Sequence, residues 1–379
     1  MSKVKIIDRR SEKSIKGERE FLSKLRHPFI VNMNCAFQDY ENLYLVMDLL
    51  TGGDLRYHLN KRKTFIEEET KFFISCLILG LEYIHKNNII HRDIKPENLV
   101  LDKNGYVRIT DFGIASIVRS NNSSETSGTP GYMAPEVLMA KNHSFPVDFY
   151  AIGIMGYEFM LGRRPYDAKN RKEMQKLVVR KPARIEEKNN VKGWSKESID
   201  FINKCLKRKV SKRLGYIDGI KELKEHPWFS DNDWEEIYNK KALAPFVPKL
   251  VGNFDKRYCK ENEKIGGETV ERYQKYRESS NFNRIFEGYT SINSELGENS
   301  LENNNNNNNN NELNTRVSTI TKQSGPIIYM INNNNNDNNK DNNNKNILNN
   351  NNNNVNNNDN NNNNNANNNN VLNNNTKKN

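Results

Sequence analysis

Features that would place this chain in a membrane, a secreted fold or a metal site are scarce. It has four cysteines in 379 residues, and none has the C-x-x-C spacing of zinc or redox sites. Its longest apolar stretch, near residues 151–161, is too short to cross a bilayer and contains Glu158. The first residues, Met-Ser-Lys-Val-Lys, do not resemble a secretory leader. We therefore expect buried free thiols, no transmembrane segment and a cytoplasmic location, with the nucleus as the alternative.

Apolar residues are also scarce in residues 302–379, where asparagine dominates and runs unbroken from Asn303 to Asn311. Such a segment buries too little apolar surface to offset the entropy of ordering, so we expect a disordered Asn-rich tail. It acts as a solvated spacer or self-associates through amide ladders. The foldable part, about residues 1–260, suits one large domain or two lobes that share a cleft.

A basic stripe is absent as well, although the net charge is +11. Lys and Arg are mixed with Asp and Glu along the chain, and they are not interleaved with aromatic residues. This pattern favours a solvated basic surface and gives no indication of a nucleic-acid partner.

The sequence does contain a few strands followed by many helices. Hydrophobic spacing and turn residues predict helices at 11–26, 54–59 and 67–87, an antiparallel pair of strands at 29–37 and 43–48, and a hairpin of 98–102 with 106–110. A long Ser/Thr/Gly-rich loop follows, and then helical segments separated by prolines. This order predicts an α+β fold with two lobes.

Three short strings carry chemistry: His91-Arg92-Asp93-Ile94-Lys95-Pro96-Glu97-Asn98, Asp111-Phe112-Gly113 and Ala134-Pro135-Glu136. Each is weak alone, but their order, with a hairpin between the first two, is specific. Phosphoryl transfer needs positioning and charge neutralisation more than covalent help. An acidic group orients the acceptor hydroxyl, a cation meets the γ-phosphate, and hard oxygen ligands hold Mg²⁺. We expect Asp93 to act as the base and Lys95 to be the cation at the γ-phosphate. We expect Asn98 and Asp111 to be the metal ligands.

Together the strings resemble the signature of eukaryotic serine/threonine protein kinases. The resemblance implies a two-lobe kinase-like fold with a mostly helical C-lobe, ATP and Mg²⁺ as cofactors, and protein substrates. Its implied boundaries are a partial N-lobe and hinge at 1–50, a C-lobe at 51–229, a C-terminal tail at 230–301 and the Asn-rich tail at 302–379. We expect a monomer.

Further segments are similar to the AGC group, named for kinases A, G and C. They include Leu45-Val46-Met47-Asp48 with Gly52-Gly53-Asp54, and Pro245-Phe246-Val247-Pro248. Residues 52–59 and 162–166 are similar to the YANK branch of this group. The resemblance implies that the nucleotide site contains Met47 as gatekeeper, Asp48, Leu50, Asp54, Glu97, Val100 and Phe254.

The same resemblance assigns supporting roles. It implies that Thr129 lies against Asp93 and Lys95, which favours Ser or Thr as the acceptor. It implies that Asp148 braces the backbone of the catalytic loop. It also implies that Arg213 pairs with Glu136.

The pattern departs from the family at its start, because no G-x-G-x-x-G occurs anywhere in the chain. Glu18 matches a helix Glu that pairs with a strand Lys, and the family spacing puts that Lys before Met1. The start is then a misassigned internal Met, or the protein is truly shortened, or Lys3 or Lys5 substitutes for the missing Lys. A pseudokinase-like binding module with little or no activity is therefore the alternative function. A small-molecule phosphotransferase is disfavoured by Ala134-Pro135-Glu136 and by the long activation loop.

Regulation and substrate choice follow from the same alignment. Glu125 stands where the group has an activation-loop phosphosite, so it mimics phosphate towards Arg92 or is simply solvated. Residues 286–290 resemble the hydrophobic motif, with Thr290 as a modifiable residue, although an aromatic pair in a polar tail has innocent explanations. The positions that receive basic substrate side chains in this group are matched here by Asp54, Glu97 and Glu158. They predict a preference for Arg or Lys near the acceptor. Arg163 and Arg164 complicate this prediction, because they would repel the same side chains.

Overall fold

The computed structural model describes residues 1–168, 170–186, 193–249, 282 and 284–292. The chain divides into two compact units, Met1–Asn306 and Asn307–Asn379, and everything below concerns the first. The predicted Asn-rich tail and the predicted nucleotide contact Phe254 lie outside the described residues.

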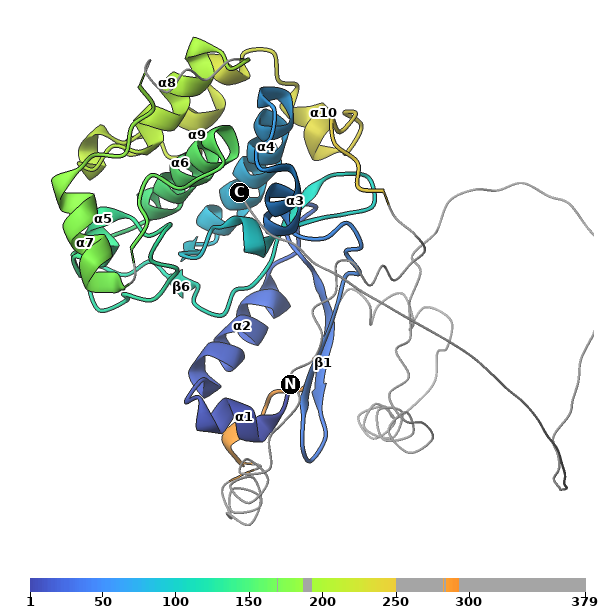
Figure 1. Ribbon diagram of the computed structural model, residues 1–379. Coiled ribbons are helices and arrows are strands. Elements are labelled where there is room, and N and C mark those ends of the chain that lie inside the picture. The colour runs from blue at the N-terminus through green and yellow to red at the C-terminus, as the bar shows by residue number, and fades with distance from the viewer. Residues whose placement is uncertain (169, 187–192, 250–281, 283, 293–379) are drawn as a thin grey trace, which may run out of the picture. The chain divides into compact units, whose positions relative to one another are not determined.

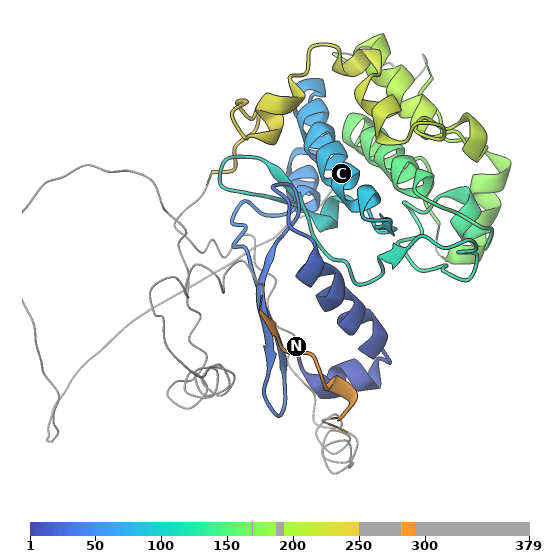
Figure 2. The same ribbon diagram turned by 180° about the vertical axis from the view of Figure 1, so that it is seen from behind.

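The first part of the fold is a small sheet with two helices beside it (Figures 1 and 2). Its elements are α1 (Lys3–Asp8), α2 (Glu12–Lys24), β1 (Met33–Gln38), β2 (Leu43–Met47) and β7 (Ser291–Ile292). The strand order is β2-β1-β7, and both pairings are antiparallel. The turn between β1 and β2 is held by Asp39, whose carboxylate accepts from the backbone N–H groups of Glu41 and Asn42. Such local hydrogen bonds are typical of Asp in turns.

The predicted strand at 29–37 is divided in two. Its second half is β1, but residues 29–31 bond to the hairpin of the helical part, where Val31 N–H donates to the Ile109 carbonyl (2.9 Å). Phe29 and Ile30 are fully buried at this junction. One apolar run therefore serves both parts of the fold, because its two halves face different partners.

The second part is mostly helical (Figure 1). Its helices and strands are α3 (Leu55–Arg62), α4 (Glu67–Lys86), β3 (Ile89–Ile90), η1 (Pro96–Asn98), β4 (Leu99–Leu101), β5 (Val107–Ile109), β6 (Ser116–Ile117), α5 (Pro135–Leu138), α6 (Pro146–Leu161), α7 (Arg171–Arg180), α8 (Lys196–Cys205), η3 (Val210–Lys212), α9 (Ile220–Lys224), η4 (Pro227–Phe229) and α10 (Trp234–Tyr238). Within the described ranges, no helix combines the length and apolarity that a bilayer-spanning segment needs.

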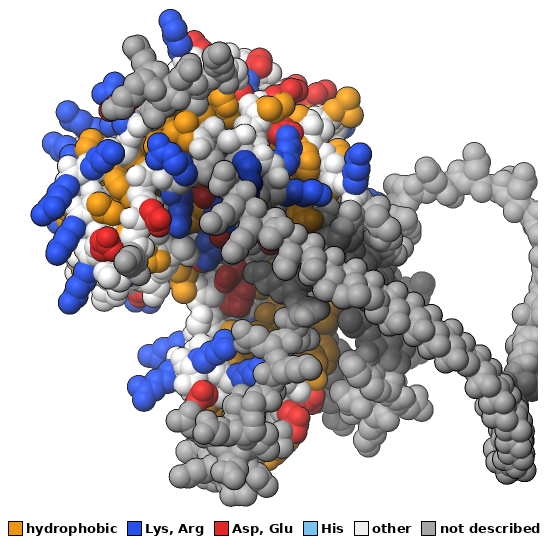
Figure 3. Space-filling model, viewed as in Figure 1, with side chains coloured by type: hydrophobic (Ala, Val, Ile, Leu, Met, Phe, Trp, Pro, Cys, Tyr) orange, Lys and Arg blue, Asp and Glu red, His pale blue; other side chains and the backbone are white. Residues whose placement is uncertain are grey.

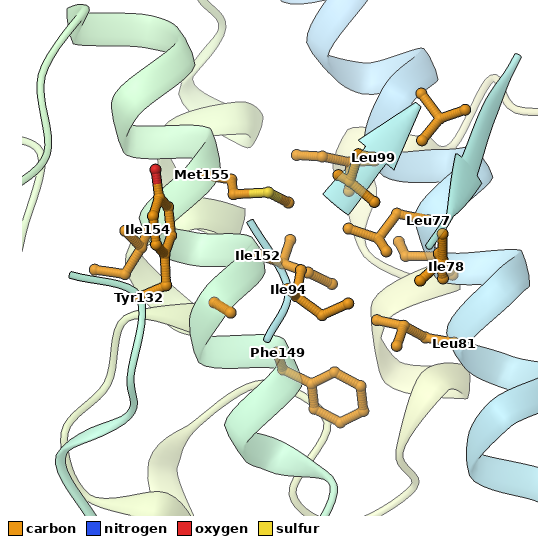
Figure 4. Packing of buried hydrophobic residues seen from close by; sticks show 14 of the residues in the cluster. Leu77, Ile78, Leu81, Ile94, Leu99, Tyr132, Phe149, Ile152, Ile154 and Met155 are labelled. Carbon is orange, nitrogen blue, oxygen red and sulfur yellow. The ribbon is translucent and has the colours of Figure 1, made fainter. Parts of the chain in front are cut away.

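The core of the helical part lies between α4 and α6 and anchors the catalytic loop (Figure 4). Ile94 is 1% exposed and lies between Ile152 of α6 and the Leu77–Ile78 face of α4. Because Ile94 is buried here, its neighbours Asp93 and Lys95 are fixed to the core by a single apolar side chain. Burying such a side chain contributes about 1.5–3 kcal/mol.

The predicted hairpin is present as β4 and β5, which pair Leu99 with Ile109 and Leu101 with Val107. Gly105 in its turn has φ +87°, and a Cβ there would lie 2.2 Å from the carbonyl oxygen of Phe246. Phe246 belongs to the predicted C-terminal tail and packs edge-on against His58, with ring centroids 5.0 Å apart. The start of that tail therefore docks on the helical part.

A second tail segment returns to the sheet. Residues 284–286 form the short helix η6 (Arg284–Phe286), and β7 then pairs with β1 at Cys35 and Ala36. Phe286 and Tyr289 are fully buried. The carbonyl of Phe286 accepts from the Gln38 amide (3.0 Å), and that of Gly288 accepts from Arg19 (2.5 Å). The sequence left open whether residues 286–290 dock, and the structure shows them packed against the sheet, with Thr290 exposed.

Charge on the helical part is mixed. On the face that Figure 3 shows, Lys and Arg side chains are scattered over this part, with Asp and Glu between them. The distribution agrees with a solvated basic surface on that face.

Candidate active site

The centre of the site is the carboxylate of Asp93. Its Oδ1 accepts from the Thr129 hydroxyl (2.7 Å) and backbone N–H (3.1 Å), and its Oδ2 accepts from Lys95 (2.5 Å) and from the Asn98 amide (3.0 Å). Lys95 also donates to the Thr129 hydroxyl (2.9 Å). Although burial opposes the charge, the hydrogen bonds from Lys95 and Thr129 lower the pKa of Asp93. The Asp93 carboxylate is therefore an anionic hydrogen-bond acceptor that is held in one position.

The loop that carries Asp93 is held from beneath by Asp148 at the start of α6. Its buried carboxylate accepts from the backbone N–H groups of His91 (3.0 Å) and Arg92 (2.9 Å) and bonds the His85 ring (2.8 Å). Arg92 has φ +67°, a conformation that costs energy for a non-glycine residue and persists only where its surroundings enforce it. Asp148 supplies part of that enforcement, in the bracing position that the sequence predicted.

The two predicted metal ligands are adjacent through the hairpin. Thr110 N–H donates to the carbonyl of Asn98 (2.9 Å), which brings the residue before Asp111 next to Asn98. The Asn98 amide nitrogen is used in bonds to Asp93, so its oxygen remains for a cation. Asp111 is exposed, and a cation fits this pair of hard oxygen donors when phosphate oxygens complete the shell. No group of three or more His, Cys, Asp or Glu side chains suited to a metal occurs in the described part of the chain.

The buried ring of His91 is influenced by the charges of three aspartates, Asp148, Asp93 and Asp111. Burial lowers the pKa of this fully buried ring, while the charges of Asp148, Asp93 and Asp111 act in the opposite direction. Its ring also packs against Phe112, with centroids 5.1 Å apart. The charges of Asp93 and Asp111 therefore both act on this one ring.

Glu18 on α2 faces Asp111 without a compensating cation. Among the residues that the structure describes, it forms no ion pair, and its carboxylate accepts from the backbone N–H of Phe112. Burial and then the charge of Asp111 raise the pKa of Glu18 to about 7. Lys3, one proposed substitute for the missing Lys, lies over the rings of Phe282 and Phe286. Lys3 therefore does not take that role in this arrangement.

The predicted nucleotide-site residues surround the segment after β2. Met47 is 40% exposed, and Leu50 is partly buried against the core. Asp48 is bonded by Arg108 and by the Asn32 amide (2.8 Å). Asp54 caps α3 by accepting from the Tyr57 N–H (2.7 Å), and its backbone lies opposite Val100. Hinge and floor residues are thus brought together.

Two contacts named in the sequence analysis are formed, one in the activation loop, where a solvated Glu125 was the alternative, and one with a structural role. Arg92 donates to the Glu125 carboxylate (3.0 Å) and to the carbonyl of Ile114. Arg119 also approaches the Glu125 carboxylate, at 4.0 Å. Glu125 thus has the arginine neighbours that a phosphate at this position would attract.

The second predicted pair, Arg213 with Glu136, is buried and bidentate. Its two hydrogen bonds measure 2.6 and 2.9 Å, and Arg213 also donates to the carbonyl of Pro146 (2.9 Å). The guanidinium centre lies 5.0 Å from the Tyr150 ring centroid. The Tyr150 ring therefore packs on the buried cation.

Sequence reasoning missed Arg56. Its guanidinium pairs with Glu158 on two nitrogens (2.9 and 3.0 Å) and with Glu97 on a third (2.8 Å), and it also bonds the Tyr132 hydroxyl. Two of the three acidic positions expected to receive substrate side chains, Glu97 and Glu158, therefore already hold an arginine. Its partners are 41 and 102 residues away in sequence, so no local pattern reveals the cluster.

A cavity of about 920 Å³ does not coincide with this site. It is lined by the end of α4, the loop before α6 and residues 215–221, and Asp93, Asn98 and Asp111 do not contribute to it. We assign the active site to the Asp93 cluster from its side-chain chemistry, because the size of a cavity does not show that it is an active site.

Comparison with known proteins shows the family of this chain. The family profile described as "Protein kinase domain" matches residues 1–229. A probable serine/threonine-protein kinase of Dictyostelium discoideum is 40% identical over 271 residues, which are 70% of this chain and 58% of that protein. The serine/threonine-protein kinase sgk-1 of Caenorhabditis elegans is 36% identical over 258 residues, 67% of this chain and 55% of that protein.

The catalytic subunit of the cAMP-dependent protein kinase of Dictyostelium discoideum is 36% identical over 252 residues, 66% of this chain and 38% of that protein. The chain spans about half the length of the first two relatives, and less of the third. Profile and relatives point the same way as the Asp93 cluster: the chain belongs to the protein kinase family, as an AGC-like domain homologous to serine/threonine kinases.

Proposed function

We propose that this chain transfers the γ-phosphoryl group of ATP to Ser or Thr residues of proteins. The observation that carries the proposal is the convergence of Lys95, Asn98 and Thr129 on the carboxylate of Asp93. Because its pKa is lowered, Asp93 is anionic and accepts a hydrogen bond that orients the acceptor hydroxyl. It takes the proton only late, as the bond from that oxygen to phosphorus forms and the hydroxyl becomes acidic.

The remaining residues divide the work of positioning. Lys95 reaches the space beside Asp93, where it neutralises charge on the transferred group. Asn98 and Asp111 would hold Mg²⁺, which supplies charge neutralisation at the phosphate oxygens when bound. Met47, Asp48, Leu50 and Val100 are proposed to border the adenine. The YANK branch stays a proposal that rests on residues 52–59 and 162–166.

Glu125 is proposed to stand in for activation-loop phosphate. Its ion pair with Arg92 connects the activation loop to the residue before Asp93. A carboxylate carries less charge and has fewer acceptor oxygens than phosphate, so the substitution is partial. The full chain should then transfer phosphate without prior modification at this position.

One observation favours a second function, a binding module of the kinase fold with little catalysis. Glu18 and Asp111 repel each other, and the described residues offer Glu18 no cation. Such repulsion loosens the arrangement of Asp111 on which metal binding depends.

The test is a transfer assay with γ-labelled ATP, Mg²⁺ and three peptides that differ only in Ser, Thr or Tyr as acceptor. We expect label on the Ser and Thr peptides and none on the Tyr peptide, with loss of transfer when EDTA removes the metal. A chain that binds ATP·Mg²⁺ but labels no peptide supports the binding module instead.

A further inference from the structure

Arg56 lies in the surface that a protein substrate must contact. It projects from α3 and meets Glu97 in the catalytic loop, between Asp93 and Asn98. It also meets Tyr132, three residues after the Thr129 that bonds Asp93. A substrate chain that brings a hydroxyl to Asp93 has to pass these two segments.

The arginine is firmly held. Its fork is bidentate on Glu158, whose side chain is 7% exposed, and a third nitrogen binds Glu97. Although burial opposes its charge, the hydrogen bond and charge of Glu158 raise the pKa of Arg56 further. Bidentate arginine–carboxylate pairs are among the strongest hydrogen-bonded contacts in proteins. An incoming arginine would have to displace this one and leave it without a partner.

A second arginine adds to the effect. The Arg164 guanidinium lies 5.7 Å from the Tyr132 ring centroid and fills the space where a Cβ on Gly131 would be, at 2.2 Å. Arg163 beside it is exposed. Arg56 thus occupies the carboxylates of both Glu97 and Glu158, and Arg164 adds a second positive charge beside Tyr132 that opposes the approach of a substrate cation.

We propose that Arg56 is an internal ligand of the acidic pocket and a specificity-determining residue, so that this kinase disfavours Arg and Lys beside its acceptor and takes neutral or acidic substrate residues there. This proposal rests on the proposed kinase function, because it concerns the choice of protein substrate. Its first test measures peptide binding and does not require phosphate transfer. It reverses the preference for basic substrates expected from the carboxylates alone, because a filled pocket repels the group that an empty one would attract.

The first measurement is binding, which does not require catalysis. Fluorescence anisotropy compares labelled peptides with Ala at the acceptor position and Arg, Gln or Glu at each flanking position in turn. The wild-type chain should bind Arg peptides no more tightly than Gln peptides. Arg56→Gln should bind the Arg peptide about tenfold more tightly at one or two positions, and Arg56→Gln with Glu158→Gln should lose that gain.

The matched control is Arg62→Ala on the same helix, which breaks the pair with Glu69 (2.7 Å) and should leave the peptide preference unchanged. If Arg56→Gln fails to fold, the wild-type chain still decides: a tenfold preference for Arg peptides overturns the proposal. An unchanged Arg-to-Gln ratio in a folded Arg56→Gln variant overturns it as well.

The second measurement is turnover of the same peptides with Ser restored. The ratio of kcat/KM for Arg and Gln peptides should follow the binding ratio in both proteins. If the wild-type chain transfers no phosphate while its binding ratios are as expected, the proposed function fails and the assignment of Arg56 stands.

Discussion

Asp93 and Glu18 both lie near Asp111, but their carboxylates are held very differently. Asp93 accepts from Lys95, Asn98 and Thr129, and its pKa is lowered, whereas Glu18 has no ion pair in the described structure and its pKa is raised to about 7. Hydrogen-bond donors therefore hold Asp93 as a carboxylate, while Glu18, with a pKa of about 7, is only partly ionised at neutral pH and would need a cation beside it to be fully anionic. The loop of Asp93 fixes its carboxylate with four hydrogen bonds, and the helix of Glu18 offers its carboxylate no ion pair within the described residues.

The largest effect on stability should come from breaking the buried ion pair of the helical part, Arg213 with Glu136. Arg213→Met leaves Glu136 buried without a partner, and we expect a loss of about 3–5 kcal/mol in the free energy of unfolding. Urea unfolding followed by circular dichroism measures it. Lys212→Met, at an exposed neighbour, should change stability by no more than about 0.5 kcal/mol. A loss below about 1 kcal/mol in Arg213→Met would show that the pair contributes little.

The next largest effect concerns Glu18 and the dependence of stability on pH. The pKa of Glu18 is raised from 4.5 to about 7 on folding, so the folded state binds more protons than the unfolded state between these values. Stability should therefore fall as pH rises through this window, by about 2–3 kcal/mol. Glu18→Gln should remove this slope.

Urea unfolding at pH 4.5, 6 and 8 compares Glu18→Gln with Glu20→Gln, an exposed site on the same helix that pairs with Lys24. The Glu20 variant should keep the slope of the wild-type chain. A wild-type slope equal to that of Glu18→Gln would mean that Glu18 has a cation partner in solution.

A smaller effect is expected where the docked segment supports the sheet. Phe286→Ala removes a fully buried ring beside β1, so residues 284–292 should undock while the helical part stays folded. Hydrogen exchange of the β1 amides should become about tenfold faster, with no change in α4 or α6. Glu287→Ala, at an exposed neighbour, serves as the control. Faster exchange throughout the chain would contradict the separation of the two parts.

The smallest effect should come from Glu125, which is about one-third exposed. Glu125→Ala removes a partly buried ion pair with Arg92, worth about 1 kcal/mol, and should reduce peptide phosphorylation roughly fivefold. Ser124→Ala should leave the rate unchanged. Full activity in Glu125→Ala would make this residue a solvated loop carboxylate and nothing more.

How much could be predicted from sequence depended on the distance between partners. Asp93, Lys95 and Asn98 lie within one short loop, and Asp111 follows one hairpin later, so the spacing of the motifs itself indicated their convergence. The Asp148 brace and the Arg213–Glu136 pair were available only through family resemblance. Arg56 was missed because its partners come from distant segments and arginine on a helix surface is ordinarily solvated.

Local pattern also failed where packing decides. The helix α1 was not predicted, since Lys3-Val4-Lys5-Ile6-Ile7-Asp8 has no helix start signal, and it forms because Val4 and Ile6 are buried. The docking of residues 286–290 stayed open because an aromatic pair in a polar tail fits a solvated segment equally well. Only the contacts with Gln38 and Arg19 decide between the two.

The central claim is that the acceptor is oriented by Asp93, and single-turnover phosphorylation by Asp93→Asn tests it most directly. Nucleotide affinity should be unchanged, while the rate of transfer at saturating ATP·Mg²⁺ should fall by about a thousandfold or more. Asp231→Asn, at an exposed aspartate paired with Lys71, should transfer at the wild-type rate. Equal rates for Asp93→Asn and the wild-type chain would contradict the account.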